Sequence, residues 1–287
     1  MAALMEDARG LDTTVPDDNR PIFLGRRAFL RAAAAVMPSA AVTGCTLTPP
    51  AGTGGTSPDR SPGTDSAARL TARPPAAGTA TAAHAPGLHA LDLDQGPEVL
   101  LHVPTGQDGT TPARLVLALH GAGQTAQDGL APLLGPAEAH RLLLLAPTSQ
   151  GSTWDAIAGG WGPDVRRIDQ ALTRVFATHQ VDAARLAISG FSDGASYALS
   201  LGLANADLFT HIIAFSPGVL IAGPRVGTPS VYLSHGLADQ ILPIDETTRR
   251  IITQLDAAHI PTELRVFDGP HTVPPDIAEG AVRWLLG

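Results

Sequence analysis

From residue 98 onward, short apolar runs alternate with longer stretches in which apolar residues recur every three or four positions. Apolar runs of four to eight residues are typical of buried strands, and the longer spacing is typical of amphipathic helices. The pattern predicts strands at 98–103, 114–119, 142–147, 211–215, 230–234 and 262–267, and helices at 130–140, 164–179, 245–258 and 275–286. Another strand begins at Leu186 and runs into a helix after Ser192. This alternation predicts an α/β fold with a mostly parallel central sheet and helices on both faces.

The first 45 residues form a predicted export signal rather than part of the fold. The pair Arg26-Arg27 precedes Phe29-Leu30, and the Ala-rich apolar region 32–36 follows. A charged region, a short apolar region and small residues at its end are the features of a secretory signal. The arginine pair resembles a twin-arginine signal. The apolar region is too short for a membrane span of about 20 residues.

Cys45 ends this segment and is the only cysteine of the chain. The stretch Val42-Thr43-Gly44-Cys45 resembles a bacterial lipobox, in which cleavage leaves the cysteine as a lipidated N-terminus. The resemblance implies an exported lipoprotein of the bacterial cell envelope, held to a membrane surface by acyl chains. The alternative is an Ala-rich helix with an incidental cysteine. One cysteine allows neither an intrachain disulfide nor a structural zinc site with two cysteine ligands.

Thr, Pro, Gly, Ala and Ser dominate residues 46–87, which contain no Phe, Trp or Tyr. Such a segment cannot bury enough apolar surface to offset the entropy lost on ordering. We therefore expect a disordered linker over 46–90 and a catalytic domain over 91–287.

The net charge of the chain bears on its possible binding partners. The net charge is −8, and all residues counted as Lys or Arg are Arg. Proteins that bind nucleic acids usually carry a basic patch or stripe. The composition therefore gives no indication of a nucleic-acid partner.

The sequence Gly190-Phe191-Ser192-Asp193-Gly194 joins the strand at Leu186 to the next helix. This Gly-x-Ser-x-Gly pattern between a strand and a helix is the nucleophile-elbow motif. A sharp strand-to-helix turn strains the central residue, and glycines on both sides let strand and helix approach. The motif predicts Ser192 as an exposed nucleophile at a helix N-terminus.

Two further groups follow strand ends later in the chain. Asp239 lies after strand 230–234, and His271 lies after strand 262–267. Since ligands meet such sheets at the carboxyl ends of the strands, the order Ser192, Asp239, His271 is that of an α/β-hydrolase triad. The rival acids Asp207, Asp245 and Asp276 occupy positions that suit helix ends.

From about residue 97 to the C-terminus, the chain resembles α/β-hydrolases of the phospholipase/carboxylesterase group and poly(3-hydroxybutyrate) depolymerase-like esterases. The resemblance is carried by Leu-His-Gly-Ala-Gly at 119–123, the elbow at 190–194, His-Gly-x-x-Asp-x-x-x-Pro at 235–243 and Gly-Pro-His at 269–271. It implies an α/β-hydrolase fold. No long insertion for a cap domain is visible in the sequence, so the site should be fairly open. The resemblance also implies that the backbone N–H groups of Ala122 and Asp193 form an oxyanion hole, while the His120 side chain supports its turn.

Candidate substrate contacts lie on two loops. Trp154 and Trp161 flank a Gly-rich loop that could offer apolar surface to an acyl group, or could pack on the sheet instead. Leu237, Ile241 and Leu242 could line the opposite wall. An open site of this kind favours short acyl esters over long lipid tails.

The motifs predict an exported serine hydrolase that cleaves small carboxylic esters through an acyl-enzyme, with no metal or organic cofactor. Two alternatives stay open: a peptidase of the same fold, and an inactive relative that binds a component of the cell envelope. The natural ester, its acyl length and the oligomeric state are not specified by the sequence.

Overall fold

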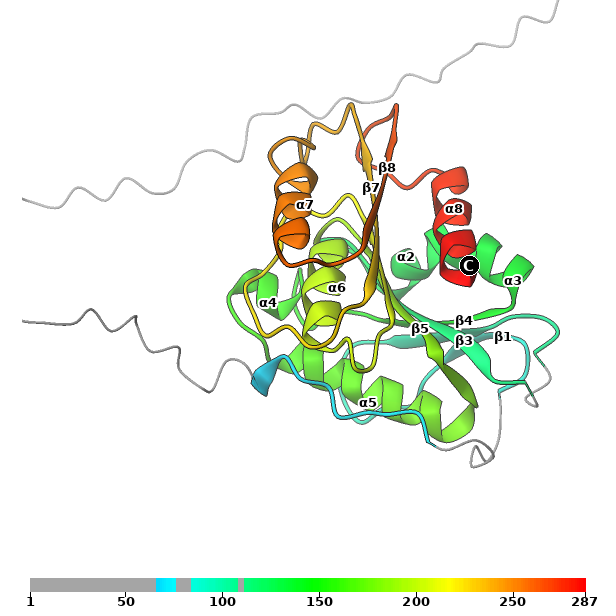
Figure 1. Cartoon of the computed structure of the whole chain (residues 1–287). Coiled ribbons are helices and arrows are strands. Elements are labelled where there is room, and N and C mark those ends of the chain that lie inside the picture. The colour runs from blue at the N-terminus through cyan, green and yellow to red at the C-terminus, as the bar shows by residue number, and fades with distance from the viewer. Residues whose placement is uncertain (1–65, 76–83, 108–110) are drawn as a thin grey trace, which may run out of the picture. The chain divides into compact units, whose positions relative to one another are not determined.

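The structure of the protein is a computed structural model that describes residues 66–75, 84–107 and 111–287. The predicted twin-arginine motif and Cys45 lie outside the described residues. The described chain forms one eight-stranded sheet in the order β1-β2-β4-β3-β5-β6-β7-β8 (Figure 1). The strands are β1 (Gly87–Ala90), β2 (Val99–Val103), β3 (Ala113–Leu119), β4 (Leu142–Pro147), β5 (Val181–Phe191), β6 (His211–Phe215), β7 (Ser230–Gly236) and β8 (Thr262–Phe267).

From β4 to β8 every neighbouring pair of strands is parallel, while β2 runs antiparallel to both of its neighbours. The mostly parallel sheet expected from the sequence is therefore observed. Parallel strands need crossovers, which the helices supply. The helices are α2 (Ala126–Leu130), a 3₁₀ turn η1 (Ala131–Leu133), α3 (Leu134–His140), α4 (Asp155–Ala158), α5 (Pro163–Thr178), α6 (Asp193–Ala204), α7 (Thr248–Ala257) and α8 (Pro275–Leu286).

Both faces of the sheet are covered because its central strands are apolar on both sides. In β3, Leu115 and Leu117 join the core beneath α5, α6 and α7, whereas Val116 and Ala118 join the core beneath α2, α3 and α8. Successive strand side chains point to opposite faces, so a continuous apolar run supplies two cores at once. Figure 1 shows the two helical layers on either side of the sheet.

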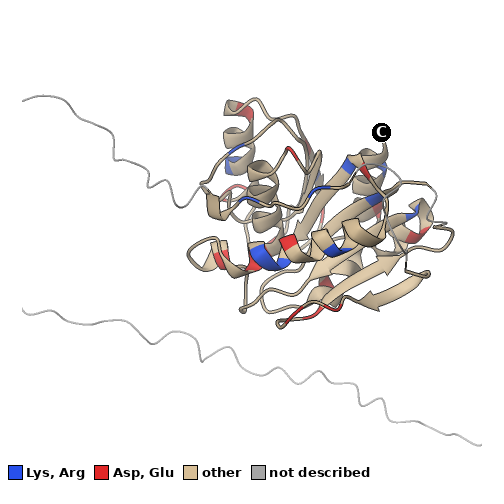
Figure 2. Ribbon diagram, turned by 90° about the horizontal axis from the view of Figure 1, so that it is seen from below, with Lys and Arg blue, Asp and Glu red and all other residues tan. Residues whose placement is uncertain are grey.

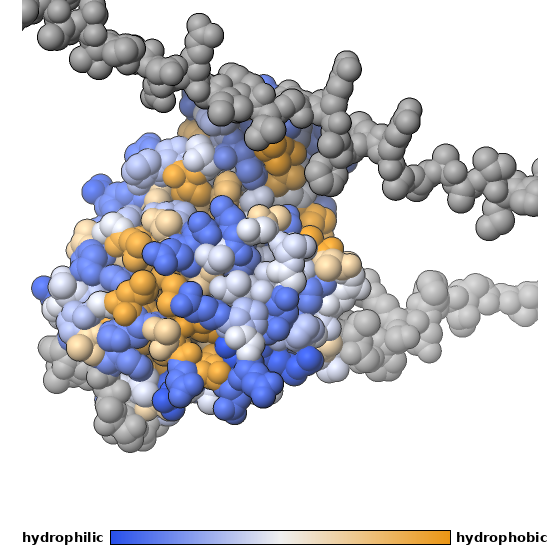
Figure 3. Space-filling model, turned by 180° about the vertical axis from the view of Figure 1, so that it is seen from behind, coloured by the Kyte–Doolittle hydropathy of each residue, from blue (hydrophilic) through white to orange (hydrophobic). Residues whose placement is uncertain are grey.

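Charged residues lie on the outer surfaces of these layers. In Figure 2, α5 crosses the front of the domain with Arg and Asp or Glu residues interspersed along it. Its inward face carries Val165, Ile168, Leu172 and Val175, all buried. Figure 3, which views the molecule from behind relative to Figure 1, shows hydrophobic residues gathered between hydrophilic ones. No helix in the described part of the chain is long and apolar enough to cross a membrane.

Three elements differ from the sequence-based expectation. The helix expected at 130–140 is divided into α2, η1 and α3, with Pro132 inside the 3₁₀ turn. Proline lacks the N–H that a continuous helix would use there. The strand β1 and the short helix α4 were not predicted, because four residues are too few to show a clear period.

The expectation of a disordered linker over 46–90 is wrong for the described residues within it. Residues 66–75, here called the strap, begin with a short helical turn at 66–68, have no regular secondary structure from 69 to 75 and pack on the domain. Residues 87–90 pair with β2 as β1. In the strap, Ala68, Leu70 and Ala72 are buried, and the alternate residues Arg69 and Arg73 reach outward. Because its residues alternate between buried and exposed, the strap presents one apolar side to the domain.

Polar contacts complete the seating of the strap. The Asn205 side chain accepts a hydrogen bond from the Leu70 N–H at 2.8 Å and donates one to the Ala68 carbonyl at 2.8 Å. Asp207 pairs with Arg69 at 2.7 Å and with Arg73 at 2.6 Å. The hydrogen bond from Arg69, together with Arg73, lowers the pKa of Asp207 to about 2. These contacts tie the strap to the C-terminal end of α6.

The Asp207 ion pairs predict an acid-sensitive part of the stability. Because the folded pKa is lowered, their stabilisation is present above the unfolded pKa of about 4 and is lost as the pH falls towards about 2. We expect Asp207→Asn to cost up to about 1 kcal/mol at neutral pH, since the pairs are partly exposed, and nothing below pH 2, where the carboxyl is protonated in both states. Urea unfolding over this pH range measures the difference. The control Asp245→Asn removes an 80% exposed carboxylate and should not show the same pH-dependent loss of stability.

Candidate active site

The elbow after β5 holds Ser192 in a strained conformation. Ser192 has φ 58° and ψ −119°, outside the regions that residues with a side chain ordinarily adopt. A Cβ on Gly190 would overlap the Gly194 carbonyl, and a Cβ on Gly194 would overlap the carbonyls of Leu119 and His120. The two glycines therefore let β5, α6 and the end of β3 meet around the serine.

The three predicted catalytic residues are brought together by three separate loops. His271 Nε2 lies 2.9 Å from Ser192 Oγ, and His271 Nδ1 lies 2.6 Å from Asp239 Oδ2. Phe191 packs against the imidazole with ring centroids 4.7 Å apart. The hydrogen-bond chain is continuous from the carboxylate to the serine hydroxyl, which is the arrangement that activates a serine nucleophile.

Asp239 is buried yet held in its charged form. Burial by itself raises the pKa of Asp239, but hydrogen bonds from the N–H groups of Leu242 (2.8 Å) and Ile241 (2.9 Å) and from His271 hold the pKa below its ordinary value. His235 Nε2 lies 3.2 Å from the same carboxylate and bonds the Leu242 carbonyl at 2.7 Å. His235 thus supports the acid loop and is not part of the hydrogen-bond chain that reaches Ser192.

The turn after β3 presents one N–H without a partner among the described residues. Gly121 N–H donates to Gln124 Oε1, Gly123 N–H to the Ser152 carbonyl, and Gln124 N–H to the Gly121 carbonyl. The Ala122 N–H is therefore the one N–H of this turn without a partner among the described residues. A Cβ on Gly121 would lie 3.4 Å from the Ser192 Cβ, so the turn borders the nucleophile.

Asp193, at the first position of α6, supplies the second predicted donor. Its N–H likewise has no partner among the residues that the structure describes. Its carboxylate accepts a hydrogen bond from Thr153 Oγ1 at 2.6 Å, a contact that the sequence did not reveal. Two free N–H groups beside a serine hydroxyl are the elements of an oxyanion hole.

His120 is fixed as a neutral support of this turn. Burial lowers the pKa of His120, whose Nε2 accepts the Ser149 N–H at 2.9 Å while Nδ1 donates to the Gly121 carbonyl at 2.7 Å. Both ring nitrogens therefore have partners, one in the turn after β3 and one in the loop after β4, in agreement with the structural role expected of this side chain.

Trp154 does not line the site, and its assignment as a substrate contact was wrong. Its side chain is fully buried, and its indole N–H donates to the His120 carbonyl at 2.9 Å. The ring lies between His120 and Tyr197, with centroids 4.8 and 5.1 Å away. Burial against the sheet was the alternative left open by the sequence. Trp154 therefore holds the turn that carries the Ala122 N–H.

A buried polar network holds the loop that carries Trp154. Asp155 accepts hydrogen bonds from Tyr197 at 2.9 Å and from the N–H of Asp164 at 2.8 Å, and Asp164 accepts the Asp155 N–H at 2.8 Å. Burial raises the pKa of Asp164, and the neighbouring Asp155 raises it further. Trp161 packs on Tyr197 with ring centroids 5.2 Å apart and is half-buried. The spacing of Asp155 and Asp164 matches no catalytic or binding motif, so the sequence did not indicate this network.

Apolar side chains flank the triad on the acid loop and on the loop after β6. Leu237 is 57% and Ile241 70% exposed, and Val219 is 47% exposed. Leu242 packs over Gly218. The Ser196 hydroxyl, one turn after Ser192, accepts the Gly218 N–H at 2.9 Å and so fixes the second loop beside the elbow. Among the described residues, no group of three His, Cys, Asp or Glu side chains could hold a metal ion.

The chain is similar to two curated fungal proteins. It is 30% identical over 158 residues to feruloyl esterase C of Emericella nidulans and 29% identical over 159 residues to a probable feruloyl esterase C of Aspergillus terreus. Each match covers 52% of this chain and 57% of the relative, so the chain spans little more than half the length of these relatives. No family model matches the chain.

Solved structures define the fold. The fluorophosphonate-binding serine hydrolase F of Staphylococcus aureus superposes with a TM-score of 0.56 at 15% identity, covering 71% of this chain and all of that one. The carboxylesterase of Bacillus cereus gives a TM-score of 0.51 at 18% identity, covering 67% of this chain and 94% of that one. The chain has the α/β-hydrolase fold, as the resemblance implied.

The Trp154 contact predicts a selective loss of turnover. In Trp154→Phe the His120 carbonyl loses a buried donor, so the oxyanion turn relaxes. We expect ester hydrolysis with kcat lowered about tenfold and KM changed less than about twofold, since the N–H acts on the transition state. The control is Trp284→Phe on α8, whose ring packs on Tyr232 and His211 without a hydrogen bond among the described residues. Equal losses in both variants would contradict the assignment.

Proposed function

We propose that the protein is a serine hydrolase that cleaves carboxylic esters. The observation that carries this proposal is the continuous chain Asp239–His271–Ser192, with separations of 2.6 and 2.9 Å. The similarity to two feruloyl esterases supports ester chemistry. The complete chain of hydrogen bonds disfavours an inactive relative that only binds. No feature of the described residues favours a peptidase over an esterase.

In the first half of the proposed reaction, Ser192 Oγ attacks the ester carbonyl carbon while His271 Nε2 takes the hydroxyl proton. Asp239 keeps Nδ1 protonated and stabilises the imidazolium that forms. The carbonyl oxygen becomes an oxyanion between the N–H groups of Ala122 and Asp193, each worth about 3 kcal/mol to such a transition state. His271 then protonates the departing alcohol, and the acyl group stays on Ser192.

The second half repeats these steps with water. His271 removes a proton from a water molecule, whose oxygen attacks the acyl carbon. The oxyanion forms between the same two donors and collapses, and Ser192 recovers its proton from His271. The net change is one ester bond hydrolysed to an acid and an alcohol, with no other reactant.

We propose substrates with a short or aromatic acyl group. The exposed side chains Leu237, Ile241 and Val219 would border the site with apolar surface but do not enclose a long tail. The names of the two curated relatives point to feruloyl, an aromatic acyl group. Phospholipase-type cleavage of long acyl lipids is the less favoured form of the proposal.

The nucleophile can be tested with a covalent probe. A fluorophosphonate should label the wild-type protein, and Ser192→Ala should abolish labelling and lower turnover by roughly 10⁴-fold. Thr272→Ala, a neighbour of His271 outside the hydrogen-bond chain, is the matched control and should keep both. Labelling that survives in Ser192→Ala would exclude Ser192 as the nucleophile. A series of p-nitrophenyl esters then measures acyl preference, and a maximum at long chains would refute the substrate class.

We also propose that the chain is exported and tethered at a membrane surface through Cys45. The support is the sequence alone: Arg26-Arg27, the Ala-rich region and the lipobox-like stretch. The described domain begins inside the range 46–90 that we expected to be a linker, because residues 66–75 pack on the domain. The segment between Cys45 and residue 66 would then form the tether.

The anchor predicts a change of compartment. Cys45→Ala, expressed in a bacterial host with twin-arginine export, should move the protein from the membrane fraction to the soluble fraction, because acyl chains supply the attachment. Esterase activity and immunoblotting of the two fractions measure this. Cys45→Ala protein that stays with the membranes would contradict lipidation, and Thr43→Ala, which keeps the cysteine, serves as the control.

A further inference from the structure

The strand β8 ends the sheet, with β7 on one side and no strand on the other among the described residues. Two hydrogen bonds, one at each end of the β7–β8 ladder, show which backbone groups of β8 point towards β7 and which point away from the sheet. The Val231 N–H donates to the Pro261 carbonyl at 2.8 Å, and the Leu237 N–H donates to the Phe267 carbonyl at 2.9 Å. Odd-numbered residues of this segment therefore turn their backbone groups towards β7.

The even-numbered residues Thr262, Leu264 and Val266 turn their N–H and carbonyl groups outward, because a strand alternates the direction of these groups. No described residue bonds these three N–H groups. Val266 also exposes 40% of its surface. An unpaired edge of this kind is a template for another strand.

We propose that this edge binds a second copy of the chain, with the two β8 strands antiparallel about a two-fold axis through Leu264. In that register Leu264 exchanges two hydrogen bonds with its counterpart, and Thr262 pairs with Val266 of the other copy at both ends. All three outward positions are then satisfied. Two sheets of eight strands become one continuous sheet, and an interface of this isologous kind is closed, so assembly ends at the dimer.

Charge selects this register over its neighbours. With the axis at Leu264, Glu263 lies opposite Arg265 of the other copy, twice. With the axis moved one residue, either two Glu263 or two Arg265 side chains would lie opposite each other. Opposite charges stabilise a directly facing pair and like charges destabilise it. Charges usually protect an edge strand from pairing. Here they favour pairing, because the two-fold axis places Glu263 of each copy opposite Arg265 of the other.

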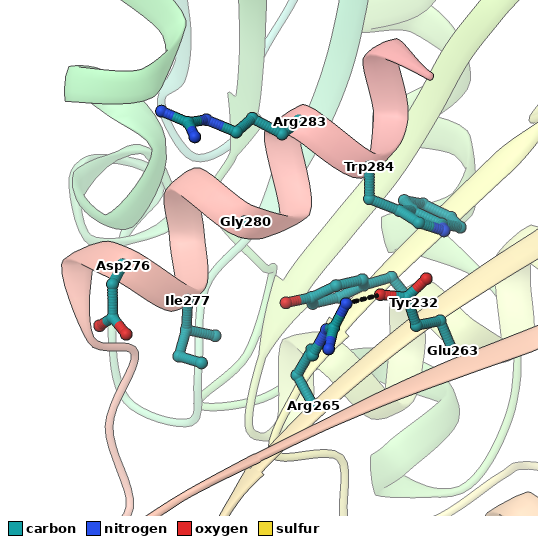
Figure 4. Close-up of a pocket in the computed structure, with 8 residues that line it drawn as sticks. All are labelled: Tyr232, Glu263, Arg265, Asp276, Ile277, Gly280, Arg283 and Trp284. Atoms are coloured by element: carbon teal, nitrogen blue, oxygen red, sulfur yellow. Dashed lines mark ion pairs between the residues drawn. The ribbon is translucent and has the colours of Figure 1, made fainter.

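The surface beside β8 has room for these side chains. A groove of about 500 Å³ lies between β8 and α8, with Glu263 and Arg265 on one side and Asp276 and Arg283 on the other (Figure 4). Within one copy Arg265 already bonds Glu263 at 2.8 Å, and the pair is 62% and 38% exposed. The second copy would extend this pair into a four-membered alternating network over the groove.

Charge reversal gives a decisive test by analytical ultracentrifugation of the full chain over a concentration series. Wild-type protein should sediment as a dimer. Glu263→Arg and Arg265→Glu should each raise the dimer dissociation constant at least about tenfold, since each places like charges opposite each other. An equimolar mixture of the two variants should dimerise again, because one copy then contributes two arginines and the other two glutamates.

Two controls separate this interface from general effects. Arg166→Glu reverses an exposed charge on α5, which packs on β4 and not on β8, and should leave the dimer unchanged. The double variant Glu263→Arg/Arg265→Glu restores opposite charges and should dimerise like the wild type, even if a single variant folds poorly by circular dichroism. A monomeric wild type, single variants that dimerise normally, or a mixture that stays monomeric would each overturn the proposal.

Discussion

The close approach of three backbone segments around Ser192 is the constraint on which the site depends. The carbonyls of Leu119 and His120, from the end of β3, lie where a side chain on Gly194 would stand, and the Gly194 carbonyl lies where one on Gly190 would stand. Only glycine fits both positions. The same approach that strains the serine also brings the turn after β3 beside it. Strain at the nucleophile and proximity of the oxyanion donor are therefore two consequences of one packing arrangement.

Rigidity of the site comes from buried polar groups that are fully paired. His120 uses one ring nitrogen for the Gly121 carbonyl in its own turn and the other for the Ser149 N–H in the loop after β4. Trp154 donates to the His120 carbonyl, and the Asp155 and Asp164 carboxylates each accept the backbone N–H of the other residue. Buried polar groups left unpaired would be costly, so each such bond specifies a position as well as stabilising it. The oxyanion turn is thus supported from behind by groups that never contact a substrate.

The strap and the free edge strand β8 lie at different positions relative to the catalytic site. The strap seats on the C-terminal end of α6, whereas Ser192 lies at the N-terminal end of the same helix. The chain that leads back to the predicted anchor thus joins the domain at the end of α6 remote from the nucleophile. At the far end of the sheet, β8 leaves backbone groups free, and the loop after it carries His271. An antiparallel pair of β8 strands would direct the carboxyl edges of the two sheets, and so the two sites, in opposite directions.

The order of apolar runs and the four motif segments were sufficient to predict the α/β-hydrolase fold and to nominate Ser192, Asp239 and His271, because these features are local or follow the chain order. The roles of Trp154 and of the strap were decided only by tertiary structure. A tryptophan near a catalytic loop has the same sequence signal whether it faces the substrate or the core, and the partner of its N–H, the His120 carbonyl, is 34 residues away. Ala68, Leu70 and Ala72 likewise look too small to order a segment until Asn205 and Asp207 supply its hydrogen bonds and ion pairs. Contacts between distant residues determine such outcomes, and the local pattern does not encode them.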